Sequence, residues 1–200
     1  MVRSSWLAKV VAMLVAGALG GCAASQNPLG PEAEAVSEPR LAGTWQYVGD
    51  KSGGWDYLHV LPGGDGRGME IVAINSAEKV WAVLSGYITA VGERRFVNLR
   101  VAEASAAVKA DLEKQQYPAT HPYSFVAVRF DGDDSMAVAY PVEQLHAAVE
   151  TGGLAGKTIG DYDVLITDTP ANIAALLGGL SDDDLFKDPL LYRRIPAASP

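Results

Sequence analysis

Short apolar runs broken by turns fill the chain from residue 41 to residue 140, and this pattern limits the fold more than any other feature. Several runs alternate apolar with polar residues, as half-buried strands do. They occur at 44–47, 57–61, 69–74, 80–90, 95–101, 123–130 and 136–140, and again at 164–167 and 190–195. Consecutive strands with few helices between them predict an antiparallel meander.

A sheet of this many strands exposes two long edges unless it closes on itself. The sequence therefore predicts a mainly β domain, built as an antiparallel up-and-down barrel or a strongly curled sheet of about eight or nine strands. Helical spacing appears at 104–114, 141–150 and 170–177, and Ser181 precedes one more helical turn. We expect these two to four short helices at one mouth of the barrel or on its outside.

The N-terminal segment has the pattern of an export signal. Arg3 and Lys9 open it, an apolar run follows at 10–19, and small residues precede Cys22, the only cysteine of the chain. The ending resembles the lipobox of bacterial lipoproteins. The resemblance implies that residues 1–21 are removed as a signal peptide and that Cys22 carries a thioether-linked diacylglycerol, usually with an N-acyl chain such as palmitate.

A transmembrane anchor is the alternative reading of the same segment. It is disfavoured, because a spanning helix needs about 20 apolar residues and this stretch is shorter and is interrupted by Lys9. For lipoproteins of this kind, Asp after the cysteine marks retention in the inner membrane. Ala23 stands there instead, which favours an outer-membrane protein facing the periplasm, with the outer leaflet of the plasma membrane as the alternative.

Residues 22–40 combine the lipidated cysteine with three prolines and many small or acidic residues, and their only large apolar residues are Leu29 and Val36. Such a composition predicts a disordered tether. A flexible chain of this length would hold the domain roughly 20–25 Å from the lipid surface. The folded part is then expected to be one β domain over 41–196.

The charge of the chain excludes one class of partner. The formal net charge is −8 at pH 7, and loss of Arg3 and Lys9 with the signal peptide takes it to −10. An excess of acid argues against nucleic acid as a partner. The expected partners are the membrane, through the lipid anchor, and either an apolar small molecule or another envelope protein.

Gly43, Thr44 and Trp45 open the first strand and resemble the Gly-x-Trp motif of lipocalins and related calycin barrels. The resemblance implies a lipocalin-like barrel in which Trp45 closes one end. It also implies that an arginine near the last strand packs across that tryptophan. Arg193 and Arg194 both lie in the last predicted strand, and either could make this contact.

Motifs for catalysis, metals or cofactors are missing from the sequence. Residues 151–158 come within one residue of a phosphate-binding loop, but a helix precedes them and a strand follows, the reverse of the order that such a loop requires. His59, His121 and His146 are isolated from one another, which does not support a zinc site. Since there is no recognisable nucleophile with its base, we expect a non-enzymatic protein without metal or cofactor.

Aromatic residues in or beside the strands are the remaining candidates for a site. Tyr57, Trp81, Tyr87 and Phe125 would line a cavity for a small apolar ligand or lipid if they point into the barrel. The alternative is that they are ordinary core residues. Two functions therefore stay open: a ligand-binding barrel, and a scaffold or assembly protein that acts through its outer surface.

Overall fold

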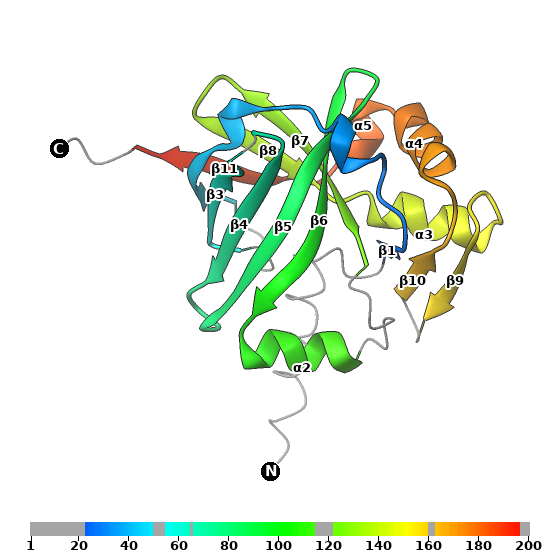
Figure 1. The fold of residues 1–200 in the computed structure, drawn as a ribbon, viewed down its shortest axis with the longest axis horizontal. Helices are drawn as coiled ribbons and strands as arrows, with labels where there is room; N and C mark the ends of the chain where they lie inside the picture. Colours follow the sequence, from blue (N-terminus) through cyan, green and yellow to red (C-terminus); the bar gives the residue numbers. More distant parts are fainter. Residues whose placement is uncertain (1–22, 50–54, 65, 115–121, 160–162, 197–200) are drawn as a thin grey trace, which may run out of the picture.

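Eight antiparallel strands close into a barrel in the computed structural model, which describes residues 23–49, 55–64, 66–114, 122–159 and 163–196 (Figure 1). Neighbouring strands around the barrel follow the order β11-β2-β3-β4-β5-β6-β7-β8. The strands are β2 (Gly43–Tyr47), β3 (Tyr57–Pro62), β4 (Gly68–Asn75), β5 (Val80–Val91), β6 (Arg94–Ala104), β7 (Ser124–Asp131), β8 (Ser135–Ala139) and β11 (Leu190–Ile195). The predicted mainly β, up-and-down barrel with few helices is confirmed.

Helices are short and few, as the spacing of apolar residues predicted. In the described part of the chain they are α2 (Ala106–Lys114), α3 (Val142–Glu150), α4 (Pro170–Gly179) and α5 (Asp182–Leu185), with single 3-10 turns at η1 (Glu32–Glu34) and η2 (Pro39–Leu41). Thr169 caps α4 by accepting a hydrogen bond from the Asn172 amide, and Ser181 caps α5 in the same way. None of the described helices is long and apolar enough to cross a bilayer.

The barrel interior is packed with apolar side chains from alternate strand positions. Trp45 and Ala73 are completely buried there, and the interior core continues through every strand of the barrel. Its buried members include Val60, Ile71, Ala82, Leu84, Ile88, Val97, Leu99, Val126, Val128, Met136, Val138 and Tyr192. Inward side chains can fill a barrel of this strand number, and here they do so along the described strands.

A second core lies outside the barrel, against β6, β7 and β8. A three-stranded sheet in the order β1-β10-β9 and the helices α3, α4 and α5 cover this side (Figure 1). Its strands are β1 (Ala23–Ser25), β9 (Gly156–Ile159) and β10 (Asp163–Ile166). Phe96 and Phe125 point outward from the barrel into this layer, so β6 and β7 are buried on both faces. The sequence did not predict β9 or the separate sheet.

The segment predicted to be a disordered tether is folded onto the barrel from Ala23 onward, which corrects that prediction. β1 pairs in parallel with β10, and Ser25 exchanges two main-chain hydrogen bonds with Tyr123, of 2.8 and 2.7 Å. Further along, the Leu29 amide donates to Asn98 Oδ1 at 2.8 Å and the Tyr87 hydroxyl donates to the Gly30 carbonyl at 2.8 Å. Hydrogen bonds between main-chain groups and from main chain to side chain order this segment, and composition alone does not reveal them. Cys22 itself lies outside the described residues.

Candidate functional site

The two ends of the barrel are closed in different ways. At one end, α2 lies across the opening (Figure 1), with Val108 fully buried in the interior core. At the other end, residues 36–42 cross the opening before the chain enters β2; we call this segment the strap. We call the opening beneath the strap the mouth. At the mouth β3, β5, β7 and β11 end, and β4, β6 and β8 begin.

Trp45 and Arg194 close the mouth from below. The Arg194 guanidinium lies 4.2 Å from the Trp45 ring, and Trp45 Nε1 donates to the Leu41 carbonyl at 2.8 Å. Arg194 also donates to the carbonyls of Ala42, at 2.6 Å, and of Arg40. Of the two arginines that the sequence offered, Arg194 makes this contact, while Arg193 is exposed on the outer face.

Gly43 occupies a position where a side chain does not fit easily. Its φ is +123°, in a region that residues other than glycine rarely adopt, and a Cβ there would lie 2.6 Å from Arg194 Nη1. The glycine therefore lets the guanidinium reach the strap carbonyls beside it. Gly43, Trp45 and Arg194 thus form one arrangement that joins the first and last barrel strands at the mouth.

Polar contacts hold the strap over the mouth. The Val36 amide donates to the Ile88 carbonyl of β5 at 3.0 Å. Glu38 and Arg40 form a two-armed ion pair, with both N–O distances at 2.8 Å, and the Arg40 guanidinium lies 4.5 Å from the centre of the Phe130 ring. Hydrogen bonding and charge attraction from Arg40, with a contribution from Arg95, hold the pKa of Glu38 below its usual value, so this carboxyl stays ionised at neutral pH.

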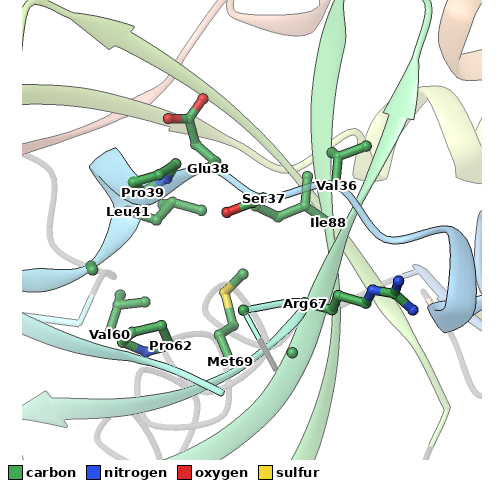
Figure 2. A pocket seen from close by; sticks show the side chains of 13 residues that line it. Val36, Ser37, Glu38, Pro39, Leu41, Val60, Pro62, Arg67, Met69 and Ile88 are labelled. Atoms are coloured by element: carbon green, nitrogen blue, oxygen red, sulfur yellow. The ribbon is translucent and has the colours of Figure 1, made fainter. Parts of the chain in front are cut away.

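A pocket of about 230 Å³ lies between the strap and the rims of β3, β4 and β5. Figure 2 shows Leu41 and Pro39 of the strap on one side of this mouth pocket, and Val60, Pro62 and Met69 on the other. Ile88 of β5 also lines it, beside Val36 and Ser37. The carboxylate of Glu38 turns away from the pocket in this view, so the side chains that surround the space are mainly apolar.

The four aromatic residues predicted to line a cavity all face out of the barrel, which corrects their predicted orientation. Tyr87 and Phe125 each stand opposite Asn98 in a cross-strand row that the N-terminal segment and the outer core cover. Tyr57 stands opposite Ile74, and Ile74 opposite Trp81. Ile74 and Trp81 are 40% and 38% exposed, which puts this second row on a face that is open to solvent among the described residues.

The sequence did not predict the pocket, because one of its sides comes from a segment that composition assigned to disorder. One signal was present: Val36 is one of only two large apolar residues in that segment, and both it and Leu29 contact the fold. Met69 and Ile88 were recognised as strand residues, but their position at the mouth depends on strand register, which the sequence pattern does not fix.

The two histidines that the structure describes lie in separate elements, His59 in β3 and His146 in α3. No group of three or more His, Cys, Asp or Glu side chains there is arranged to hold a metal ion. His59 Nδ1 contacts the Thr44 hydroxyl at 2.8 Å, and His146 pairs with Glu150 on the same helix at 3.3 Å. His121 lies outside the described residues. The mouth pocket remains the candidate binding site.

No family model, no curated protein and no solved structure matches this chain. The assignment of a function consequently rests on the geometry of the barrel mouth and on the N-terminal sequence pattern.

Proposed function

We propose that this chain is a membrane-anchored lipoprotein of the cell envelope, with a lipocalin-like barrel that binds a small apolar ligand or one end of a lipid. The observation that carries the proposal is the mouth pocket, a space of about 230 Å³ between the strap and three barrel strands. Apolar walls favour an apolar occupant, because burial from water contributes about 25 cal/mol per Å² of apolar surface.

The size of the pocket limits the ligand. Pockets for drug-sized molecules occupy about 300–1,000 Å³, and the mouth pocket is smaller than that range. It fits a small molecule or the end of an acyl chain. This location differs from a ligand chamber in the middle of the barrel, since Trp45, Val60 and Ile71 fill the interior near the pocket floor.

The lipid anchor follows from the sequence around Cys22, and the folded N-terminal segment changes its geometry. A peptide bond places the Cα of Cys22 ~3.8 Å from that of Ala23, and Ala23 is already buried in β1. A lipidated Cys22 would therefore bring the membrane against the domain, without the flexible spacer that composition predicted. An outer-membrane location facing the periplasm is part of this proposal.

Two experiments test the proposal separately. Cys22→Ser should abolish metabolic labelling with palmitate and leave an uncleaved precursor, and normal labelling of this variant would refute the anchor. For the pocket, the full chain is placed in nanodiscs and cross-linked with a photoreactive decanol. Saturable cross-linking to peptides 36–42 and 67–69 is expected.

A matched pair of variants makes the pocket experiment specific. Met69→Trp should fill the mouth pocket and remove the saturable cross-linking, because Met69 lines it. Ile74 lies on the outer face of the same strand, so Ile74→Trp should leave the cross-linking unchanged. Equal cross-linking of both variants would show that decanol binds elsewhere.

A scaffold function is the second candidate, and one observation favours it. The row of Tyr57, Ile74 and Trp81 presents apolar surface on a side of the barrel that the described residues leave exposed. Exposed apolar rows with Trp and Tyr are typical of protein interfaces. If this row is the working surface, Trp81→Ser should reduce recovery of an envelope partner after cross-linking in cells, while Met69→Trp should not.

A further inference from the structure

A second hollow lies across the strap from the mouth pocket. It has a volume of about 690 Å³, and we call it the arginine groove because four arginines line it: Arg40, Arg94, Arg95 and Arg129. Three acidic residues, Glu38, Glu93 and Asp182, share its walls. The groove therefore carries a positive excess in a chain whose formal net charge is −8.

Three of the arginines already have acidic partners. Arg40 pairs with Glu38 at 2.8 Å, and Asp182 lies 2.9 Å from Arg94 and 3.9 Å from Arg129. The Arg129 guanidinium also lies 4.4 Å from the centre of the Phe186 ring. Acidic residues and aromatic rings thus hold these guanidinium groups in place along the groove.

Arg95 differs from the other three. Its guanidinium donates only to the main-chain carbonyls of Glu93 and Arg94, both at 3.5 Å, and no ion pair joins it to an acidic residue of the described chain. Arg95 stands opposite Val128, which belongs to the interior core. Cross-strand partners share a face of the sheet, so Arg95 faces the barrel mouth. It has donors available for an anion that arrives there.

The mouth pocket and the arginine groove are close enough for one ligand to reach both. Glu38 of the strap lines both hollows. On β5, Ile88 lines the pocket and Val91 lines the groove. Three residues along a strand correspond to about 10 Å and place the two side chains on opposite faces, so Val91 marks the outer wall of the groove and Glu38 its wall nearest the pocket. The strap therefore separates the apolar mouth pocket from a cationic groove that begins at the mouth, at Glu38 and Arg95, and extends to Phe186 of the outer layer.

We propose that the two hollows together bind one anionic amphiphile, with its apolar chain in the mouth pocket and a carboxylate or phosphate headgroup at Arg95. The proposal rests on the proposed function, because the chain of the ligand occupies the same pocket. It adds the chemical class of the ligand and names the residue that distinguishes an acid from a neutral compound of equal length.

The test compares three probes that carry the same photoreactive group: decanoate, decyl phosphate and decanol. The full chain in nanodiscs is titrated with each probe, and saturable cross-linking to the mouth peptides is quantified by mass spectrometry. Arg95→Gln should raise the half-saturating concentration of an anionic probe about tenfold, the loss expected for one charge-assisted hydrogen-bonded contact. The same change should leave decanol unaffected. For each probe, the variant is compared with the wild type in discs of the same lipid, so that partitioning of the probe into lipid affects both proteins equally.

Arg193→Gln is the control, because Arg193 is exposed on β11 away from both hollows, and it should change none of the three titrations. A tenfold effect on only one of the two anions supports the proposal and identifies the headgroup. Equal binding of all three probes with no effect of Arg95→Gln overturns the proposal and leaves the proposed function standing. Loss of decanol binding in Arg95→Gln also overturns it, since Arg95 would then act through packing. Failure of every probe to saturate refutes both.

Discussion

The two ends of this barrel show how the means of closure decides what an end can do. Helix α2 closes one end with apolar side chains: Val108 is fully buried in the interior core. Tyr192 belongs to the same core, and its hydroxyl donates to the Trp55 carbonyl at 3.2 Å. Burial raises the pKa of Tyr192, as expected where water is excluded. The strap closes the other end with hydrogen bonds, an ion pair and two arginine–aromatic contacts.

Hydrogen bonds and ion pairs can hold a segment over an opening without filling it, whereas closure by packed apolar side chains leaves little empty space. The strap is held by hydrogen bonds to the Ile88 carbonyl and from Arg194, so its side chains do not have to fill the mouth beneath it. The mouth pocket lies on one side of the strap and the arginine groove on the other. Closure by packed apolar side chains contributes to stability in proportion to the surface buried. We infer that the α2 end serves mainly stability and that the strap end serves binding.

The largest effect should come from the tryptophan beneath the strap. Trp45→Ala removes a completely buried ring and should lower the free energy of unfolding by about 3–5 kcal/mol. Denaturant unfolding of the full chain measures this change. A loss below about 1 kcal/mol would show that Trp45 does not support the barrel at this end.

The matching change at the opposite end should cost less. Val108→Ala removes two methyl groups from a fully buried side chain, and we expect a loss of about 1–3 kcal/mol in the same unfolding experiment. Ligand cross-linking at the mouth should stay normal in this variant. Loss of cross-linking would contradict the division of roles between the two ends.

A third variant probes the attachment of the N-terminal segment. Asn98 is fully buried and accepts from the Leu29 amide at 2.8 Å, while its own amide donates to Thr89 Oγ1 at 2.8 Å. Asn98→Leu should cost about 1–3 kcal/mol, because the Leu29 amide loses its partner. Hydrogen exchange should then quicken at residues 29–36. Unchanged exchange there would mean that other contacts hold the segment.

How far the sequence predicts this molecule depends on whether local pattern or long-range contact builds each part. Alternating runs locate the barrel strands, and Gly43 with Trp45 indicates the closing motif, because these signals lie within a few residues. The covering sheet of β1, β10 and β9 joins segments about 140 residues apart in the chain. No local pattern reports such a pairing, and it is this pairing that orders the segment leading to the strap.

The local sequence pattern also did not predict whether the aromatic side chains point into the barrel or out of it. A shift of one residue in strand register exchanges the two faces of a sheet. β6 and β7 are buried on both faces, so their apolar residues do not alternate with polar ones. Phe125 on β7 therefore gave no sign that it belongs to the outer layer.

The smallest effect concerns the ion pair of the strap. The pKa of Glu38 is lowered in the folded protein, so the folded state binds fewer protons there than the unfolded state does. Its contribution to stability is present above the ordinary value of 4.5 and is lost as the pH falls below it. Glu38→Gln should melt slightly below the wild type at pH 7, and the difference should shrink toward pH 3. A constant difference would exclude charge as its cause.

The most direct test of the mouth as the binding site uses three isoleucines that report three places. Ile88 lines the mouth pocket, Ile71 lies in the barrel interior and Ile74 is exposed on the outer face. The full chain with ¹³C-labelled isoleucine methyl groups is placed in nanodiscs, and nuclear Overhauser contacts to bound decanol are recorded. We expect the strongest contacts at Ile88, weaker ones at Ile71, which stands opposite the pocket residue Val60, and none at Ile74. Contacts to Ile71 without Ile88 would place the ligand inside the barrel, and contacts to Ile74 alone would place it on the outer surface; either result would contradict the account.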